Sequence, residues 1–339
     1  MPVISTSRLI TIDRHITEEE DRHPGATGAF TSILHDLTFA FRLIAREVRR
    51  AGLSDILGLT SNYNVHGEQV RKIDEYANEA IYRSMYRNQQ IAAMISEENE
   101  EPLDIPSEFQ RGKYILAFDP LDGSTNIDVN GVLGTIFSLL KKKETDSDEK
   151  CGLNDILQPG FKQVAAGYIL YGSSTVLAYT TGSGINIFTY DPTIGEFLLI
   201  DEGHKMPDYG WHYSCNEAYS MTWDKWVQDY LDHIKSISRT GNKYKSRYYA
   251  TAVADIHRLL YTGGVYMYPG SNEKPEGKIR LLYEASPLSM IVEQAGGKAI
   301  TGPERILDII PHDIHQTVPV FLGSKENIEE LEYFFRKYS

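Results

Sequence analysis

Apolar positions recur along this chain with two different spacings, which predict a mixture of helices and strands. The spacing of an amphipathic helix runs from Ile33 to Val48 and from Val70 to Met85. Short continuous apolar runs predict buried strands at 91–95, 114–118 and 134–140. Further elements follow in order: strands at 164–171, 175–180, 185–190, 196–200 and 263–268, and helices at 222–235, 252–261 and from Pro287 to Ala295. The pattern predicts an α/β fold.

Stretches with few large apolar residues separate some of these elements. Residues 1–24 are polar and mixed, and predict an arm that contributes little to the core. Residues 52–72 are rich in Asn, Ser and Gly and predict a mobile loop. A polar link at 205–210 contains Pro and Gly, so a domain boundary is predicted there, between residues 1–200 and 201–339.

Composition narrows the class of protein. A chain of 339 residues can form two domains, and its net charge of -13 argues against nucleic acid or an anionic membrane as a partner. Two cysteines exclude a disulfide framework, and no apolar run reaches the length of a membrane span. The segment 1–13 lacks a signal-peptide core, which favours a cytoplasmic location. A peroxisome-like organelle stays open as an alternative if a C-terminal signal follows Ser339.

Acidic residues gather where predicted strands end. Glu97 and Glu98 follow the run 91–95, Asp119 and Asp122 follow the run 114–118, and the apolar run 278–284 closes on Glu284. Each acid alone has an ordinary interpretation as a turn former or a charged loop residue. Open α/β sheets place ligands beyond the carboxyl ends of their strands, so neighbouring strands that both end in acids predict one acidic crevice.

The chemistry of this crevice follows from its charge. With Asp74 from the helix 70–85, these carboxylates carry too much negative charge for one dry pocket unless cations share it. Oxygen ligands favour two or three Mg²⁺ or Mn²⁺ ions, and Zn²⁺ also takes carboxylates. The turn Gly123-Ser124-Thr125 offers N–H groups and hydroxyls that suit a phosphate. Together these features predict metal-dependent phosphoester hydrolysis by water. The motifs of P-loop NTPases and protein kinases are absent from the sequence.

The segment Asp119–Asn126 resembles the signature of the lithium-sensitive sugar and inositol phosphatase superfamily. The rest of the chain, from about residue 25 to 335, resembles class I fructose-1,6-bisphosphatases more closely than inositol monophosphatases. The stretches that carry this resemblance are 67–74, 96–98, 111–114, 134–137, 165–168, 213–219, 253–258, 267–269, 277–284 and 307–311. The resemblance implies a layered α/β/α/β/α fold with two mixed-sheet domains. It also implies hydrolysis of the 1-phosphate of fructose 1,6-bisphosphate to fructose 6-phosphate in gluconeogenesis.

The resemblance further implies roles for individual residues. Metal ligands would be Glu97, Glu98, Asp119, Asp122, Glu284 and the Leu121 carbonyl, while Asp74 and Glu98 would help to deprotonate the attacking water. Asp122, Gly123, Ser124 and Thr125 would hold the reacting phosphate. The remaining substrate-binding residues would be Asn216, Tyr219, Tyr248, Tyr268, Lys278 and Arg280, together with Arg247 reaching in from a neighbouring subunit of a homotetramer.

An inhibitory AMP site is implied at the turn 25–31, which opens the helix containing Ile33 to Val48 and where the residues alone favour a simple helix cap by Thr27 or Thr31. The matching residues are Thr27, Gly28, Ala29, Thr31, Lys113, Tyr114 and Lys141. Ala29 and Lys141 replace a usual glutamate and arginine, so AMP inhibition with altered affinity is expected. Two alternatives remain open: a sedoheptulose-1,7-bisphosphatase or dual bisphosphatase, and an inactive regulatory binder.

Overall fold

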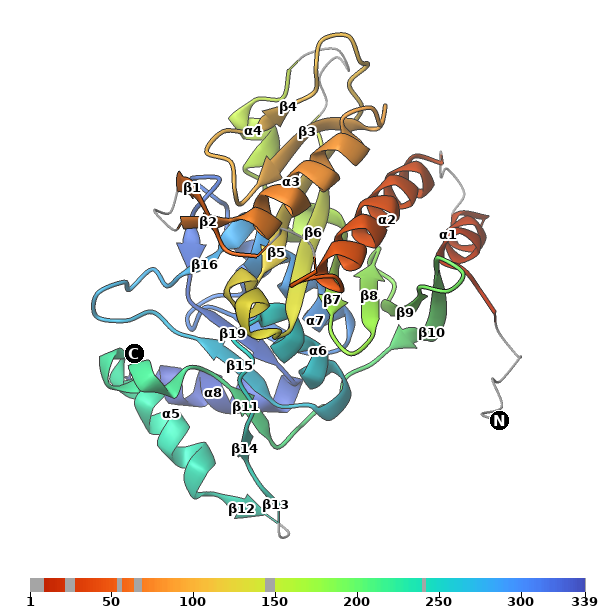
Figure 1. The fold of residues 1–339 in the computed structure, drawn as a ribbon. Coiled ribbons are helices and arrows are strands. Elements are labelled where there is room, and N and C mark those ends of the chain that lie inside the picture. The colour runs from red at the N-terminus through yellow and green to blue at the C-terminus, as the bar shows by residue number, and fades with distance from the viewer. Residues whose placement is uncertain are drawn as a thin grey trace, which may run out of the picture.

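The structure, a computed structural model, describes residues 9–21, 28–53, 57–63, 69–143, 150–239 and 242–338. Helices and sheets alternate in an α/β/α/β/α arrangement, with a large sheet in the N-terminal half and a small sheet in the C-terminal half (Figure 1). The predicted fold class is therefore confirmed.

Within the described part of the chain, eight strands form the large sheet, and the predicted strands of this half are confirmed. Neighbouring strands are antiparallel except for β3 and β5, which run parallel. In sheet order the strands are β10 (Glu196–His204), β9 (Ile185–Asp191), β8 (Thr175–Thr180), β7 (Gln163–Tyr171), β6 (Leu133–Lys141), β5 (Tyr114–Asp122), β3 (Ile91–Ser96) and β4 (Leu103–Asp104).

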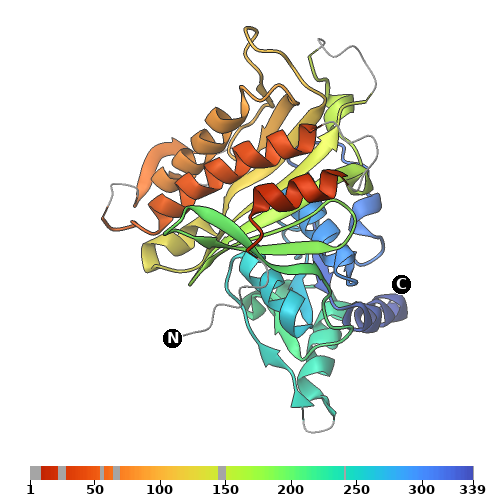
Figure 2. The same ribbon diagram turned by 90° about the vertical axis from the view of Figure 1, so that its right-hand side faces the viewer.

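The outer face of the large sheet is covered by α1 (Ile12–Asp21), α2 (Ala29–Val48) and α3 (Lys72–Met85) (Figure 2). The buried stripe of α2 matches the predicted helical spacing, and Phe41 packs on Phe137 of β6 with ring centroids 5.5 Å apart. The expectation that residues 1–24 contribute little to the core is wrong, because Ile12 and Ile16 of α1 are buried in this layer.

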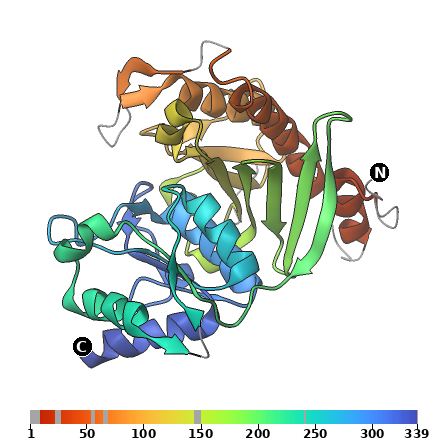
Figure 3. The ribbon, with the colours of Figure 1, turned by 60° about the horizontal axis from the view of Figure 1, so that its bottom comes forward.

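The middle layer consists of α6 (Ala252–Thr262) and α7 (Ser286–Gln294), which lie between the two sheets (Figure 3). Ile256, Leu260 and Ile291 are fully buried there, against Ile136 and Ile187 of the large sheet and Leu322 of the small one. Both sheets therefore share one apolar core, since each places one face on the same pair of helices.

In the described residues the small sheet has five strands, and α5 (Lys225–Ser236) and α8 (Lys325–Tyr338) cover its outer face. In sheet order its strands are β14 (Lys245–Ser246), β11 (His212–Ser214), β15 (Val265–Tyr268), β19 (Val320–Gly323) and β17 (Lys298–Ile300). Short pairs join β12 (Ser238–Arg239) to β13 (Asn242–Lys243) and β16 (Ile279–Arg280) to β18 (Thr317–Val318). The remaining helices are α4 (Leu153–Ile156) and short turns at 124–129, 160–162, 217–222, 281–285 and 306–308.

Two further expectations need correction. The stretch 52–72 contains an antiparallel pair, β1 (Leu59–Tyr63) with β2 (Gln69–Arg71), where a loop was predicted; residues 54–56 and 64–68 lie outside the described residues. The run 278–284 is not one strand, because β16 ends at Arg280 and a π-helical turn, η4 (Leu281–Ala285), leads directly into α7. A continuous apolar run cannot by itself distinguish a strand from a buried helical turn.

None of the helices within the described ranges is long and apolar enough to cross a membrane.

The burial of α1 generates a stability prediction. Ile12 is fully buried, so Ile12→Ala should lower the free energy of unfolding by about 2–4 kcal/mol because it leaves a cavity. Leu9→Ala is the matched control, since Leu9 is 62% exposed and its loss should change stability little. Denaturant unfolding of both variants measures the difference; equal stabilities would show that α1 does not belong to the core.

Candidate active site

The acidic crevice is formed where β3 and β5 end side by side. These strands pair in parallel, with Ser96 opposite Phe118, so Glu97 and Asp119 follow at the same edge. β5 continues to Asp122 instead of ending at Phe118, and an irregularity in its pairing with β6 falls between the two aspartates. Asp119 is 2% exposed and accepts a hydrogen bond from the Leu121 N–H at 2.9 Å. The predicted neighbourhood of these strand ends is present in the structure.

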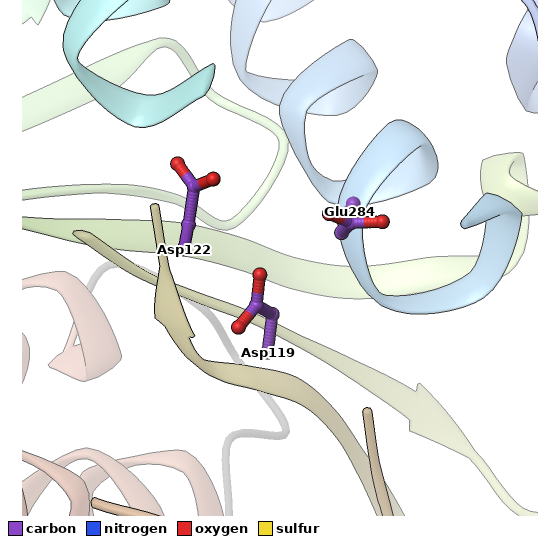
Figure 4. Close-up of side chains that lie close together, drawn as sticks. All are labelled: Asp119, Asp122 and Glu284. Atoms are coloured by element: carbon purple, nitrogen blue, oxygen red, sulfur yellow. The ribbon is translucent and has the colours of Figure 1, made fainter. Parts of the chain in front are cut away.

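Glu284 reaches the same place from the other half of the chain. It lies on the η4 turn and accepts a hydrogen bond from the Arg280 N–H at 2.6 Å. Figure 4 shows Glu284 on a helical turn close to Asp119 and Asp122, which both come from β5. Carboxylate oxygens of these three residues lie within 4.8 Å of one another. An all-oxygen set at this spacing fits a hard divalent cation such as Mg²⁺ or Mn²⁺.

The electrostatics of this cluster also fit a cation. Loss of hydration raises the pKa of Glu97 and of Asp119 well above the usual carboxyl range, and neighbouring carboxylates raise both further. Burial likewise raises the pKa of Asp122 to about 8. Arg280 is the basic group closest at hand, 2.9 Å from Glu97 and 3.9 Å from Glu284. One guanidinium balances only part of this charge, so the protein has gathered carboxylates that an added cation would stabilise.

Asp74 and Glu98 lie at the edge of the cluster. Asp74 is buried in the first turn of α3 and accepts a hydrogen bond from the Arg71 N–H at 3.0 Å. The N–H of Glu98 donates to Ser96 Oγ at 3.3 Å. Both carboxylates raise the pKa of Glu97 by charge repulsion, so the structure brings them to the same crevice as Glu97.

The phosphate turn starts at Gly123, which adopts a left-handed conformation with a φ of 75°. A Cβ at this position would collide with the hydroxyl of Thr251, so only glycine fits. Ser124 and Thr125 then open a 3₁₀ turn, η1 (Ser124–Val129), in place of the simple turn that was expected. Left-handed glycine followed by a helical turn presents successive N–H groups, as anion-binding turns do.

A cavity of about 540 Å³ opens beside the cluster and contains most of the predicted distal anchors. Asn216, Tyr219, Tyr268 and Lys278 line it. Burial is the main cause of the raised phenol pKa of Tyr248, and the charges of Tyr268 and Asp122 raise it further. Tyr248 therefore lies near both the cavity and the acidic cluster. Arg247 is exposed and donates a hydrogen bond to the Ser246 carbonyl at 2.6 Å. The structure of one chain does not bring Arg247 to the cavity lining.

A second cavity, of about 630 Å³, lies at the start of α2. Its lining includes most of the residues matched to the AMP site: Gly28, Ala29, Thr31, Lys113, Tyr114 and Lys141. Thr27 lies outside the described residues. The expected cap by Thr31 is wrong: Gly28 is the N-cap, and Glu20 of α1 accepts hydrogen bonds from the Gly28 N–H and from Thr31 Oγ1, the latter at 2.6 Å.

Comparison with known families agrees with this geometry. The model of "Fructose-1-6-bisphosphatase, N-terminal domain" matches residues 10–202, and that of "Fructose-1-6-bisphosphatase, C-terminal domain" matches residues 206–336. The chain belongs to the fructose-1,6-bisphosphatase family. Proteins of this family are phosphoric monoester hydrolases, so the acidic crevice is a candidate active site of that kind.

Individual relatives match along their whole length. The class 1 fructose-1,6-bisphosphatase of Chlorobium chlorochromatii is 51% identical over 97% of this chain and 98% of its own. That of Maridesulfovibrio salexigens is 48% identical over 98% of this chain and 99% of its own. The crystal structure of Leishmania major fructose-1,6-bisphosphatase in holo form superimposes with a TM-score of 0.89 at 36% identity, covering 96% of this chain and 98% of the other.

Sequence reasoning missed several residues that complete these sites. Glu20 fell in the stretch expected to be an arm, although its helical pattern with Ile12 and Ile16 was a usable signal. Val253 donates its N–H to Asp122 Oδ2 at 2.8 Å, and Thr251 faces Gly123; neither contact has a signature in the local sequence.

The raised carboxyl pKa values predict how metal-free protein responds to pH. The pKa of Asp122 rises from 3.8 to about 8 on folding, so the folded state binds its proton more tightly than the unfolded state. Stability from this group is therefore complete at low pH and is lost as the pH rises toward 8, by up to about 1.4 kcal/mol per pH unit. With chelator present, the free energy of unfolding should fall between about pH 5 and about pH 8.

Excess Mg²⁺ or Mn²⁺ should flatten this dependence, because a bound cation replaces the protons and stabilises the folded state. Asp122→Asn removes one titrating group and should make the metal-free slope shallower. Chemical denaturation across pH, with and without metal, measures both effects. A metal-free slope that is identical in the wild type and in Asp122→Asn would contradict the assigned environment of Asp122.

Proposed function

We propose that this protein hydrolyses the 1-phosphate of D-fructose 1,6-bisphosphate to fructose 6-phosphate and phosphate, a step of gluconeogenesis. The observation that carries the proposal is the pairing of two sites: an acidic cluster with an anion-binding turn, and a tyrosine- and lysine-lined cavity beside it. A substrate with a phosphate at each end of a short sugar suits this pair. The name of the relatives that are about half identical along the whole chain supports the same substrate.

Each residue of the cluster has a task that its position allows. Glu97, Glu98, Asp119, Asp122, Glu284 and the Leu121 carbonyl would hold Mg²⁺ or Mn²⁺, with Zn²⁺ as a weaker fit to an all-oxygen set. Bound divalent ions supply Lewis acidity and a water of lowered pKa. Asp74 and Glu98, at the edge of the cluster, accept the proton of the attacking water. The N–H groups of Gly123, Ser124 and Thr125 hold the phosphoryl oxygens, and Arg280 adds positive charge beside them.

The distal phosphate binds in the neighbouring cavity. Lys278 supplies charge, and the hydroxyls of Tyr219, Tyr248 and Tyr268 with the Asn216 amide fix its orientation. Arg247 is exposed in the isolated chain, which supports its contribution to a neighbouring subunit in a homotetramer. The predictions of a cytoplasmic location and of two or three ions for each subunit stand as expectations.

A phosphate-release assay tests the main proposal. The wild type should hydrolyse fructose 1,6-bisphosphate with Mg²⁺ or Mn²⁺ and lose this activity in excess chelator. Asp122→Ala should lower kcat by at least about a thousandfold, because it removes a ligand at the reacting phosphate. Sedoheptulose 1,7-bisphosphate, one carbon longer, is the comparison substrate.

The outcomes separate the alternatives. Faster release from the seven-carbon substrate would favour a sedoheptulose-1,7-bisphosphatase, and near-normal turnover of Asp122→Ala would refute the assigned site. No release from either substrate would leave only a binding protein.

We infer that the cavity at the start of α2 binds AMP as an inhibitor. Lys113, Lys141 and Tyr114 line it, and a helix N-terminus attracts phosphate. In the described conformation Glu20 already bonds to this N-terminus through Gly28 and Thr31. The carboxylate therefore occupies donors that an incoming phosphate needs, and AMP binding requires Glu20 to leave.

This competition gives a prediction. Glu20→Gln should lower the AMP concentration for half-inhibition by about two- to fivefold, because a neutral amide interacts more weakly with the helix N-terminus. Glu19→Gln is the matched control: Glu19 lines the same cavity, so it loses the same charge without disturbing the cap. Equal effects of both variants would contradict the capping role of Glu20, whereas insensitivity of the wild type to millimolar AMP would remove the AMP proposal itself.

A further inference from the structure

The reacting-phosphate turn and the segment that carries Tyr248 are held together by a cluster of hydrogen bonds around the buried Thr251. Asn126 Nδ2 donates to Thr251 Oγ1 at 2.7 Å and contacts the carbonyl oxygens of Tyr249 and Val132, both at 3.1 Å. Thr251 Oγ1 in turn donates to the Val132 carbonyl at 2.8 Å. We call these four residues the Asn126–Thr251 link.

The geometry of the link is specific. The Thr251 hydroxyl has one proton, which it gives to Val132, and it accepts from Asn126, so its donor and acceptor roles are both used. Thr251 is 1% exposed, so its hydroxyl is satisfied by these two protein partners. The link therefore resists small displacements of Tyr249 and Thr251 relative to the turn.

The backbone is strained at Ala250, beside the link, which indicates that the surrounding contacts hold this segment in place. Ala250 adopts a φ of 58°, in the left-handed region that non-glycine residues avoid at a cost of about 1 kcal/mol. It lies between Tyr249 and Thr251, whose groups the link holds, and against Gly123, where a Cβ would collide with Thr251. Such strain persists where surrounding contacts over-determine the conformation.

The same segment connects both phosphate sites. On one side it leads into α6, whose Val253 N–H donates to Asp122 Oδ2 at 2.8 Å in the acidic cluster. On the other side Tyr248 precedes the link, and its surroundings include Tyr268 of the distal cavity as well as Asp122. The link thus lies on the connection between the group that binds the reacting phosphate and a group that binds the distal one.

We propose that the Asn126–Thr251 link sets the spacing between the two phosphate sites, which makes Asn126 and Thr251 positioning residues for the selection of a bisphosphate. The inference rests on the proposed function. A bisphosphate gains from the distal site only when both phosphates reach their donors at once, and a displacement of the order of 1 Å can cancel much of that gain. A monophosphate that lacks the distal group uses the reacting site alone and does not sense the spacing.

The test compares two substrates and two matched variants. Thr251→Val keeps the size of the side chain and removes its hydroxyl, whereas Thr251→Ser keeps the hydroxyl. Phosphate release is measured from fructose 1,6-bisphosphate and from fructose 1-phosphate, and the ratio of their kcat/KM values is compared. Thr251→Val should lower this ratio about tenfold, through kcat/KM for the bisphosphate, while Thr251→Ser keeps it within about twofold of the wild type.

The outcomes are separable. An unchanged ratio of kcat/KM values in Thr251→Val overturns the proposal. An equal fall of kcat/KM for both substrates also overturns it, because it indicates a purely structural role. If Thr251→Val does not fold, as judged by its melting temperature, Asn126→Ser carries the same comparison, because it leaves the Thr251–Val132 bond in place. A wild type that releases no phosphate from fructose 1,6-bisphosphate refutes the proposed function and this inference together, whereas an active wild type with unchanged ratios refutes the inference alone.

Discussion

Buried carboxylates at the ends of β3 and β5 repel one another, and this repulsion governs the groups that surround the site. Burial and like charge both oppose ionisation of Glu97, Asp119 and Asp122, so the fold must supply compensation. Arg280 provides part of it by pairing with Glu97 and Glu284. The N–H of Val253 provides another part at Asp122. The negative charge that these groups leave uncompensated favours the binding of cations, so the folded chain provides a metal site.

These compensating groups come from the middle layer and from the strand that leads into it. Val253 lies in the first turn of α6, and Arg280 directly precedes the π-helical turn that enters α7. Because α6 and α7 are packed between both sheets, the acids of the large sheet and the helices against the small sheet are held in one rigid core. The distal cavity, with Lys278 two residues before Arg280, is therefore attached to the same frame as the reacting site.

Opposite charges are also balanced in the outer layer, at the cavity at the start of α2. A helix N-terminus with unsatisfied N–H groups needs an acceptor, and Glu20 provides it from α1. An anionic ligand would compete for the same donors. Glu20 is carried by α1, whose Ile12 and Ile16 are buried in the core against the large sheet.

Local patterns in the sequence predict most of the helices and strands and the chemistry of the site. Apolar spacing predicted α2, α3, α6 and the strands of the large sheet other than β4, because periodic burial of side chains depends on neighbours along the chain. The acids that follow the apolar runs 91–95 and 114–118 predicted the crevice, because neighbouring strands that both end in acids place them at one edge of a sheet. Three features became visible only in the folded chain: the helical turn that carries Glu284, the cap by Glu20 and the bonds between Asn126 and Thr251. The bonds of Asn126 with Thr251 and of Val253 with Asp122 join residues more than a hundred positions apart, and a local pattern carries no record of such a partner.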